Sequence, residues 1–179
     1  MNHYHIQGQT DKKPVRSIYG IGRNYAQHAA ELNNAIPERP IIFLKPLSSL
    51  CYSGDTVLIP KMSKDVHHEI ELLLSIGKQG RNIPTEKALD FIEGVGLVID
   101  FTARDLQSEA KKKGHPWTVA KGFDTFTAIS ALKPASNYPD LQNLKLELKV
   151  NDQVRQNDST SLMLFTIPDI LHHLTQVVT

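Results

Sequence analysis

Short apolar runs bounded by turn residues recur along the chain and predict a series of short β-strands. Runs of this length, closed by glycine, proline or asparagine, are typical of strands. The predicted strands cover residues 17–22, 39–46, 56–60, 69–76, 95–102 and 144–150. In the last of these, apolar and charged residues alternate, as expected for a strand with one exposed face. Asn151-Asp152 directly follows it and predicts a hairpin turn.

Helical composition is confined to a few short segments. The predicted helices cover residues 24–33, 84–91, 103–113 and 168–174. The segment 103–113 has acidic residues in its first half and three lysines in its last turn, which is the charge order that stabilises a helix. Gly114 follows directly, and glycine commonly ends a helix. Residues 1–16 are polar without periodicity, and we expect them to form a short leader ahead of a domain at 17–179.

Two glutamates stand one residue apart at the start of the run 69–76. Because residues i and i+2 of a strand share a face, Glu69 and Glu71 are predicted to point into one space and Ile70 the other way. Such close carboxylates repel unless a proton, basic side chains or a divalent cation compensates. Oxygen ligands suit Mg²⁺, Mn²⁺ or Ca²⁺. The simpler alternative is a surface strand with solvated glutamates, because glutamate is mostly exposed.

Two further charged residues fall where the pattern is otherwise apolar. Asp100 lies near the end of the predicted strand 95–102, where a carboxylate is unusual. It could instead cap the helix that follows. Lys121 stands among small and apolar residues, which suggests a lysine that faces a pocket.

A histidine and a glutamate share a face of the first predicted helix. His28 and Glu31 are three residues apart, so their side chains can touch. A neighbouring carboxylate can orient a histidine and raise its pKa, and the pair then suits a general base that activates water. On spacing alone, a surface ion pair is the commoner explanation.

The composition of the chain gives no support for several kinds of partner and rules out an internal disulfide. A chain of 179 residues can bury one sizeable core. A net charge of +1 gives no reason to expect nucleic acid or an anionic membrane as partner, and no apolar run approaches the length of a membrane span. The single cysteine, Cys51, cannot form an internal disulfide and is expected to be buried. The polar start lacks a signal-peptide pattern, so we expect a cytoplasmic setting.

Six ordered stretches form a recognisable pattern. They are Gly22-Arg23-Asn24-Tyr25-Ala26-x-His28, Phe43-Leu44-Lys45-Pro46, His68-Glu69-Ile70-Glu71-Leu72, Asp100-x-Thr102-Ala103-Arg104-Asp105-x-Gln107, Lys113-Gly114-x-Pro116-Trp117 and Ala120-Lys121-Gly122-Phe123-Asp124. Together they resemble the fumarylacetoacetate hydrolase (FAH) family, in particular its acylpyruvase and oxaloacetate decarboxylase-like members. The resemblance runs from about residue 17 to the end of the chain.

The resemblance implies a fold, a cofactor and roles for particular residues. The implied fold is α+β, with a β-rich rolled sheet around the site and a few short helices, in a protein that forms homodimers. The implied cofactor is Mg²⁺ or Mn²⁺, with Ca²⁺ possible in crystals. The residues that match are Glu69, Glu71 and Asp100 as metal ligands, His28 and Glu31 as a water-activating dyad, Lys121 as a catalytic lysine, and Arg23, Arg104 and Gln107 as substrate contacts or groups that orient the ligands.

The implied activity is hydrolysis or decarboxylation at a carbon–carbon bond of a small 2-oxo acid, such as an acylpyruvate or oxaloacetate. Isomerisation or decarboxylation of dicarboxylic intermediates of aromatic catabolism is the alternative within the family. Related chains continue past the helix at 168–174 into further strands with a glycine-rich motif, and we expect this chain to lack them. A non-catalytic relative that serves as a binding or dimer partner is therefore a third possibility.

Overall fold

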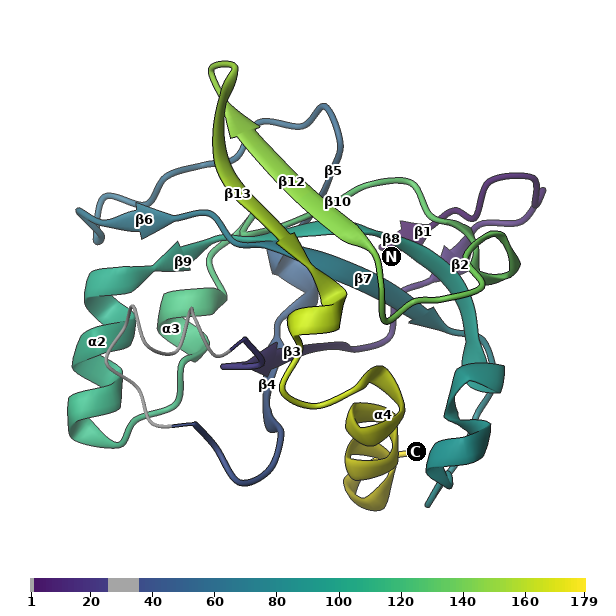
Figure 1. The fold of residues 1–179 in the computed structure, drawn as a ribbon. Helices are drawn as coiled ribbons and strands as arrows, with labels where there is room; N and C mark the ends of the chain where they lie inside the picture. Colours follow the sequence, from purple (N-terminus) through teal and green to yellow (C-terminus); the bar gives the residue numbers. More distant parts are fainter. Residues whose placement is uncertain (1, 26–35) are drawn as a thin grey trace. The chain divides into compact units, whose positions relative to one another are not determined.

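A run of nine residues forms strand β8 (Ile92–Asp100) in the largest sheet of the computed structural model (Figure 1). The sheet has the order β11 (Lys133–Pro134), β8, β10 (Thr127–Ile129) and β5 (Leu50–Tyr52), and β7 (Ile70–Ile76) also pairs with β8. β10 is antiparallel to β8 and parallel to β5, in a register that sets Asp100 opposite Thr127. The structure describes residues 2–25 and 36–179.

The remaining strands form two-stranded sheets. These pair β1 (His3–Tyr4) with β2 (Lys13–Pro14), β3 (Ile18–Gly22) with β4 (Ile41–Lys45), β6 (Val66–His67) with β9 (Thr102–Ala103), and β12 (Lys145–Val150) with β13 (Gln153–Ser159). Among the described residues, the α-helices are α2 (Arg104–Lys113), α3 (Thr118–Lys121) and α4 (Ile167–Val177). Short 3₁₀ helices are η1 (Leu47–Ser49), η2 (Thr85–Phe91), η3 (Ala135–Asn137) and η4 (Thr160–Leu162). This mixture agrees with the expected α+β class.

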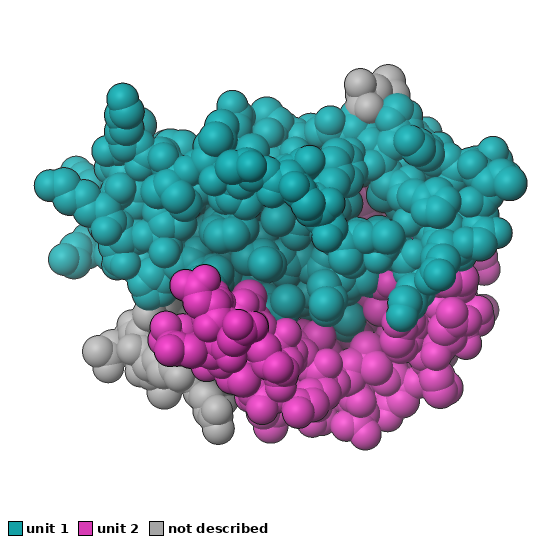
Figure 2. All heavy atoms as spheres, turned by 90° about the horizontal axis from the view of Figure 1, so that it is seen from above, with its two compact units in different colours: residues 1–20, 43–73, 96–133 teal, residues 21–42, 74–95, 134–179 magenta. Residues whose placement is uncertain are grey.

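Contacts between Cα atoms divide the chain into two units, coloured separately in Figure 2. The first comprises residues 1–20, 43–73 and 96–133. Its core contains Phe126, which is fully buried and packs against the rings of Phe101 and Phe123. Residues near the N-terminus contribute to this core, because Ile6 is buried and bridges to Leu132.

The second unit comprises residues 21–42, 74–95 and 134–179. In this unit α4 packs against η2, and the Thr175 hydroxyl accepts a hydrogen bond from the Ile83 amide at 3.1 Å. Thr166 caps α4 and shares a capping box with Asp169, which satisfies amides at the helix start. The β12–β13 hairpin turns at Asn151-Asp152, where both residues have positive φ as a tight hairpin turn requires.

Several sequence expectations are confirmed by these elements. The strands at 17–22, 39–46, 69–76, 95–102 and 144–150 are present with small shifts of their ends, and α2 ends at Gly114 in the left-handed conformation. Cys51 is buried. The region predicted as helix 84–91 is the 3₁₀ helix η2, and α3 was not expected.

The predicted strand at 56–60 is wrong. These residues belong to no strand, and the Leu58 amide donates instead to the Thr125 hydroxyl at 2.8 Å. The side chains of Leu58 and Ile59 are each 61% exposed. An apolar run forms a strand only where a partner strand accepts its hydrogen bonds, and in the structure this segment has none.

Candidate metal centre

Three carboxylates converge in the first unit. Glu69 directly precedes β7, Glu71 is its second residue, and Asp100 is the last residue of β8. One ligand oxygen from each lies within 4.8 Å of the others. The two segments are joined by a hydrogen bond of 2.9 Å from the Asp100 amide to the Glu69 carbonyl. The shared face of a strand and the end of its neighbour therefore bring these acids together, and we call them the acid trio.

Asp100 does not cap the helix that follows. The residue at the N-cap of α2 is Ala103, and no side chain caps this helix end. The Asp100 side chain is instead only 3% exposed and accepts hydrogen bonds from two lysines, Lys45 and Lys121. The alternative that treated Asp100 as a helix cap is therefore wrong, and the buried carboxylate needs another explanation.

Three cationic side chains surround the acid trio. Lys121 donates to Asp100 and, at 2.7 Å, to Oε2 of Glu69. Lys45 donates to Asp100 and, at 2.7 Å, to the backbone carbonyl of Lys121. Arg104 donates to the other oxygen of Glu69, so that each oxygen of Glu69 and of Asp100 has a cationic partner.

Arg104 is itself held in place. Its second terminal nitrogen donates to Oε1 of Gln107 at 2.6 Å, one turn further along α2, and both side chains are buried. Of the two roles expected for Arg104 and Gln107, the geometry favours orientation of Glu69. Buried charges that are paired and hydrogen-bonded in this way hold their geometry firmly.

Glu71 is the member of the acid trio without such a partner. No described side chain donates a hydrogen bond to its carboxylate, which is part-buried. Burial, with the charges of Asp100 and Glu69, raises the pKa of Glu71 to about 8, although Lys121 and Lys45 oppose the rise. The neighbouring lysines therefore do not offset the burial of this carboxyl group and the charges of the other two acids.

The residues present fit a hard divalent cation. The donor set consists only of carboxylate oxygens, which Mg²⁺, Mn²⁺ and Ca²⁺ prefer. An ion that took the place of the Glu71 proton would supply the charge that this carboxylate lacks. Three protein ligands would also leave positions open for water or substrate on an octahedral ion.

An aromatic pair lies beside Lys121. Its ammonium nitrogen is 5.2 Å from the centre of the Phe43 ring, and that ring lies 5.6 Å from the Trp117 ring. Contacts of this kind stabilise a cation over a ring face. The lysine thus contacts carboxylates and an aromatic ring. That it faces a pocket stays a prediction, because the residues that line the described pocket do not include Lys121.

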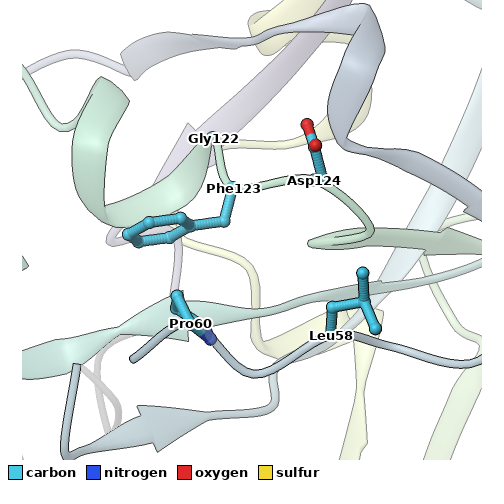
Figure 3. Close-up of a pocket in the computed structure, with 5 residues that line it drawn as sticks. All are labelled: Leu58, Pro60, Gly122, Phe123 and Asp124. Atoms are coloured by element: carbon cyan, nitrogen blue, oxygen red, sulfur yellow. The ribbon is translucent and has the colours of Figure 1, made fainter. Parts of the chain in front are cut away.

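A separate pocket adjoins the segment that follows Lys121. Its volume is about 340 Å³, and its lining residues are Leu58, Pro60, Gly122, Phe123 and Asp124. In Figure 3 the Phe123 ring lies above Pro60, while the Asp124 carboxylate points away from both Pro60 and Leu58. With largely apolar walls and a single carboxylate turned aside, this pocket has no set of metal ligands.

The structure does not test the predicted roles of three further site residues. His28 and Glu31 lie outside the described residues. Arg23 belongs to the second unit, where its φ of 60° is strained for a residue with a side chain. Its buried Nε atom has no hydrogen-bond partner among the described residues. The substrate-contact role of Arg23 stays a prediction.

Sequence reasoning missed Lys45 as part of the site. Lys45 ends β4 and is 5% exposed, whereas the preceding Leu44 is 58% exposed, so the charged side chain is buried and the apolar one is not. The available signal was the same as for Lys121, a lone lysine in an apolar stretch. It was outweighed by Pro46, which marked the position as a strand end.

Comparison with known proteins identifies the family. The model of the "Fumarylacetoacetate (FAA) hydrolase C-terminal" family matches residues 17–179. An oxaloacetate tautomerase, FAHD1, from Arabidopsis thaliana is 47% identical over 167 residues, which are 93% of this chain and 75% of that protein. An oxaloacetate decarboxylase from Dictyostelium discoideum is 46% identical over 165 residues, 92% of this chain and 76% of that protein.

Solved structures agree. The fumarylpyruvate hydrolase of Pseudomonas aeruginosa, solved in complex with Mn²⁺ and pyruvate, superimposes with a TM-score of 0.90 at 32% identity, covering 98% of this chain and 77% of that one. The chain therefore belongs to the fumarylacetoacetate hydrolase family, as its motifs suggested. No helix among the described residues is long and apolar enough to cross a membrane.

Proposed function

We propose that this chain cleaves a carbon–carbon bond of a small 2-oxo acid, with Mg²⁺ or Mn²⁺ held by Glu69, Glu71 and Asp100. One observation carries the proposal: three carboxylates from two chain segments converge within 4.8 Å, and Lys121 contacts two of them. Relatives named oxaloacetate tautomerase, oxaloacetate decarboxylase and fumarylpyruvate hydrolase support it. In this proposal residues 17–179 form the catalytic part of the chain.

The chemistry that a bound divalent ion supplies in such a site is Lewis acidity toward the two adjacent oxygens of a 2-oxo acid. The remaining work belongs to the protein. Lys121 places a positive charge where negative charge develops as the carbon–carbon bond breaks. Arg104 holds Glu69 in one orientation, and Gln107 holds Arg104, in the manner of outer partners that tune a metal site.

Delivery of water decides which reaction follows. If His28, oriented by Glu31, removes a proton from water, cleavage of an acylpyruvate is a hydrolysis. If a carboxylate leaves as CO₂, no nucleophile is needed and the same site acts as an oxaloacetate decarboxylase. Keto–enol tautomerisation requires only proton transfer. The proposal therefore fixes the substrate class, a small 2-oxo acid, and leaves these reactions to be separated by assay.

We also propose a cytoplasmic homodimer. A single cysteine suits a reducing compartment, and symmetric pairs are the commonest oligomers. The names of the plant and Dictyostelium relatives include "mitochondrial". Fractionation of the source cells and light scattering of the purified protein test the two points. Recovery with mitochondria would overturn the first, and a monomeric mass would overturn the second.

Titration of the purified protein with Mg²⁺, with and without oxalate as a 2-oxo acid analogue, tests the proposal. Glu69→Gln removes one ligand, whereas Glu109→Gln changes an exposed carboxylate on α2 and serves as the matched control. We expect stoichiometric binding that is lost in Glu69→Gln only. Turnover is then compared for an acylpyruvate, oxaloacetate and a hydroxy-diene-dioate. Absence of Mg²⁺ and Mn²⁺ binding by the unaltered protein would contradict the proposal.

A further inference from the structure

Two buried lysines contact the acid trio, but they do so in different ways. Lys121 donates to one oxygen of Glu69 and one oxygen of Asp100, and both acceptors are carboxylates of the trio. Lys45 donates to the other oxygen of Asp100 and to a backbone carbonyl. Neither of these side chains is more than 4% exposed. Only Lys121 therefore bridges two of the groups that a divalent ion would need.

The two lysines differ in the carboxylates with which they pair. The Lys121 ammonium group lies 2.7 Å from Glu69 and 2.5 Å from Asp100, whereas the carboxylate that Lys45 contacts is Asp100. Lys121 is therefore the counter-ion that Glu69 and Asp100 share.

Besides its bond to Asp100, Lys45 has a second bond that an ion does not replace. The carbonyl of Lys121 is neutral and belongs to the end of α3, so its hydrogen bond to Lys45 joins β4 to this helix. The next residue, Pro46, packs against Gly122, where an added Cβ would come within 3.0 Å of the proline ring. Ser49 adds a hydrogen bond of 2.7 Å to the side chain of Thr127, which lies opposite Asp100 where β10 pairs with β8.

We propose that Lys121 is the exchangeable cation of the acid trio, which a divalent ion displaces from Glu69 and Asp100, whereas Lys45 is a positioning residue that stays on Asp100. This inference rests on the proposed function, because it requires the trio to bind an ion. Two positive charges compete for the same two carboxylates, so the ion must overcome the bonds of Lys121. Once displaced, the ammonium group is free for a negatively charged substrate, and metal binding prepares the lysine for its catalytic role.

The first test measures Mn²⁺ affinity by calorimetry in four proteins. Lys121→Met removes the competing charge, and we expect it to bind Mn²⁺ tighter than the unaltered protein by about tenfold or more. Lys121→Arg keeps the charge and is expected to bind no tighter. Lys113→Met, on the exposed side of α2, is the control and should leave the affinity unchanged. Equal or weaker binding by Lys121→Met would overturn the inference.

Thermal unfolding separates the two lysines. Without metal, Lys121→Met and Lys45→Met are both expected to unfold at lower temperature, since each leaves at least one carboxylate oxygen of the trio without its cationic partner. Saturating Mn²⁺ should restore Lys121→Met to the melting temperature of the Mn²⁺-bound unaltered protein, but not Lys45→Met. Equal restoration of both variants would refute the positioning role of Lys45.

A measurement on the unaltered protein covers the case in which the variants do not fold. Reductive methylation of lysines, followed site by site with peptide mass spectrometry, is expected to become several-fold faster at Lys121 when Mn²⁺ is added, and to stay constant at Lys45. No acceleration at Lys121 in protein that binds Mn²⁺ would overturn the inference and leave the proposed function standing. If the unaltered protein binds no Mn²⁺ at all, both fail.

Discussion

The proton on Glu71 gives a quantitative test of the metal centre. With its pKa raised to about 8 by burial, Asp100 and Glu69, this carboxyl group is uncharged in most metal-free molecules at neutral pH. At pH 7 a group of that pKa is roughly nine-tenths protonated, and at pH 9 roughly one-tenth. A metal ligand must be deprotonated, so Mg²⁺ binding should release about 0.9 proton per ion at pH 7 and about 0.1 at pH 9.

Calorimetry measures this proton release directly. Mg²⁺ is titrated into the protein in two buffers of different ionisation enthalpy, at each of the two pH values, and the difference in heat gives the number of protons. Because binding competes with the proton, the apparent affinity should rise about tenfold from pH 7 to pH 9. Glu71→Gln should release no such proton and bind at least about tenfold more weakly. Identical proton release at both pH values would refute the reasoning.

The same proton determines how the stability of the metal-free protein varies with pH. Above pH 4.5 the unfolded chain has released this proton, while the native state keeps it until about pH 8. The unfolded state binds fewer protons in this window, so the contribution of Glu71 to the free energy of unfolding falls as pH rises. Glu71→Gln copies the neutral acid and should lose this fall. Urea unfolding across the window measures it, and an unchanged slope in the variant would contradict the assignment.

Three further predictions concern bonds within the first unit or within the second. Arg104→Met removes one of the two cationic partners of Glu69, which keeps Lys121, and should lower the free energy of unfolding by about 1–3 kcal/mol in urea titrations; a loss under about 0.5 kcal/mol, as at an exposed site, would contradict a buried pair. Asn24→Ala removes both side-chain bonds to the backbone of Phe165 and should cost about 1–3 kcal/mol, against no change if these bonds do not form in solution. Thr166→Ala removes the cap of α4 and should cost about 1 kcal/mol, whereas Thr166→Ser should restore most of it; equal losses in both would refute the cap.

The hydrophobic periodicity of the sequence predicted the strands that pair with a neighbouring strand. It also predicted that Glu69 and Glu71 share a face. Glu69 and Glu71 could be placed together because a strand fixes the direction of alternate side chains. The segment 56–60 has the same apolar character, but strand formation depends on a partner elsewhere in the chain, which local pattern does not reveal. The helix at 84–91 was recognised as helical, but the local pattern did not reveal its 3₁₀ form or its contact with α4.

The acid trio was predicted in full only with the help of the family motifs. Nothing local brings Asp100 to Glu69, since their proximity follows from the pairing of β7 with β8. The role of Lys45 was invisible for the same reason: its bonds run to residues 55 and 76 positions further along the chain. Residues that act through long-range contacts of this kind need the fold before their role can be recognised.

Anomalous diffraction from crystals soaked in Mn²⁺ locates the bound ion. We expect a single strong anomalous peak within bonding distance of carboxylate oxygens of Glu69, Glu71 and Asp100. A peak elsewhere, or no peak at this position under saturating Mn²⁺, would contradict the proposed metal centre.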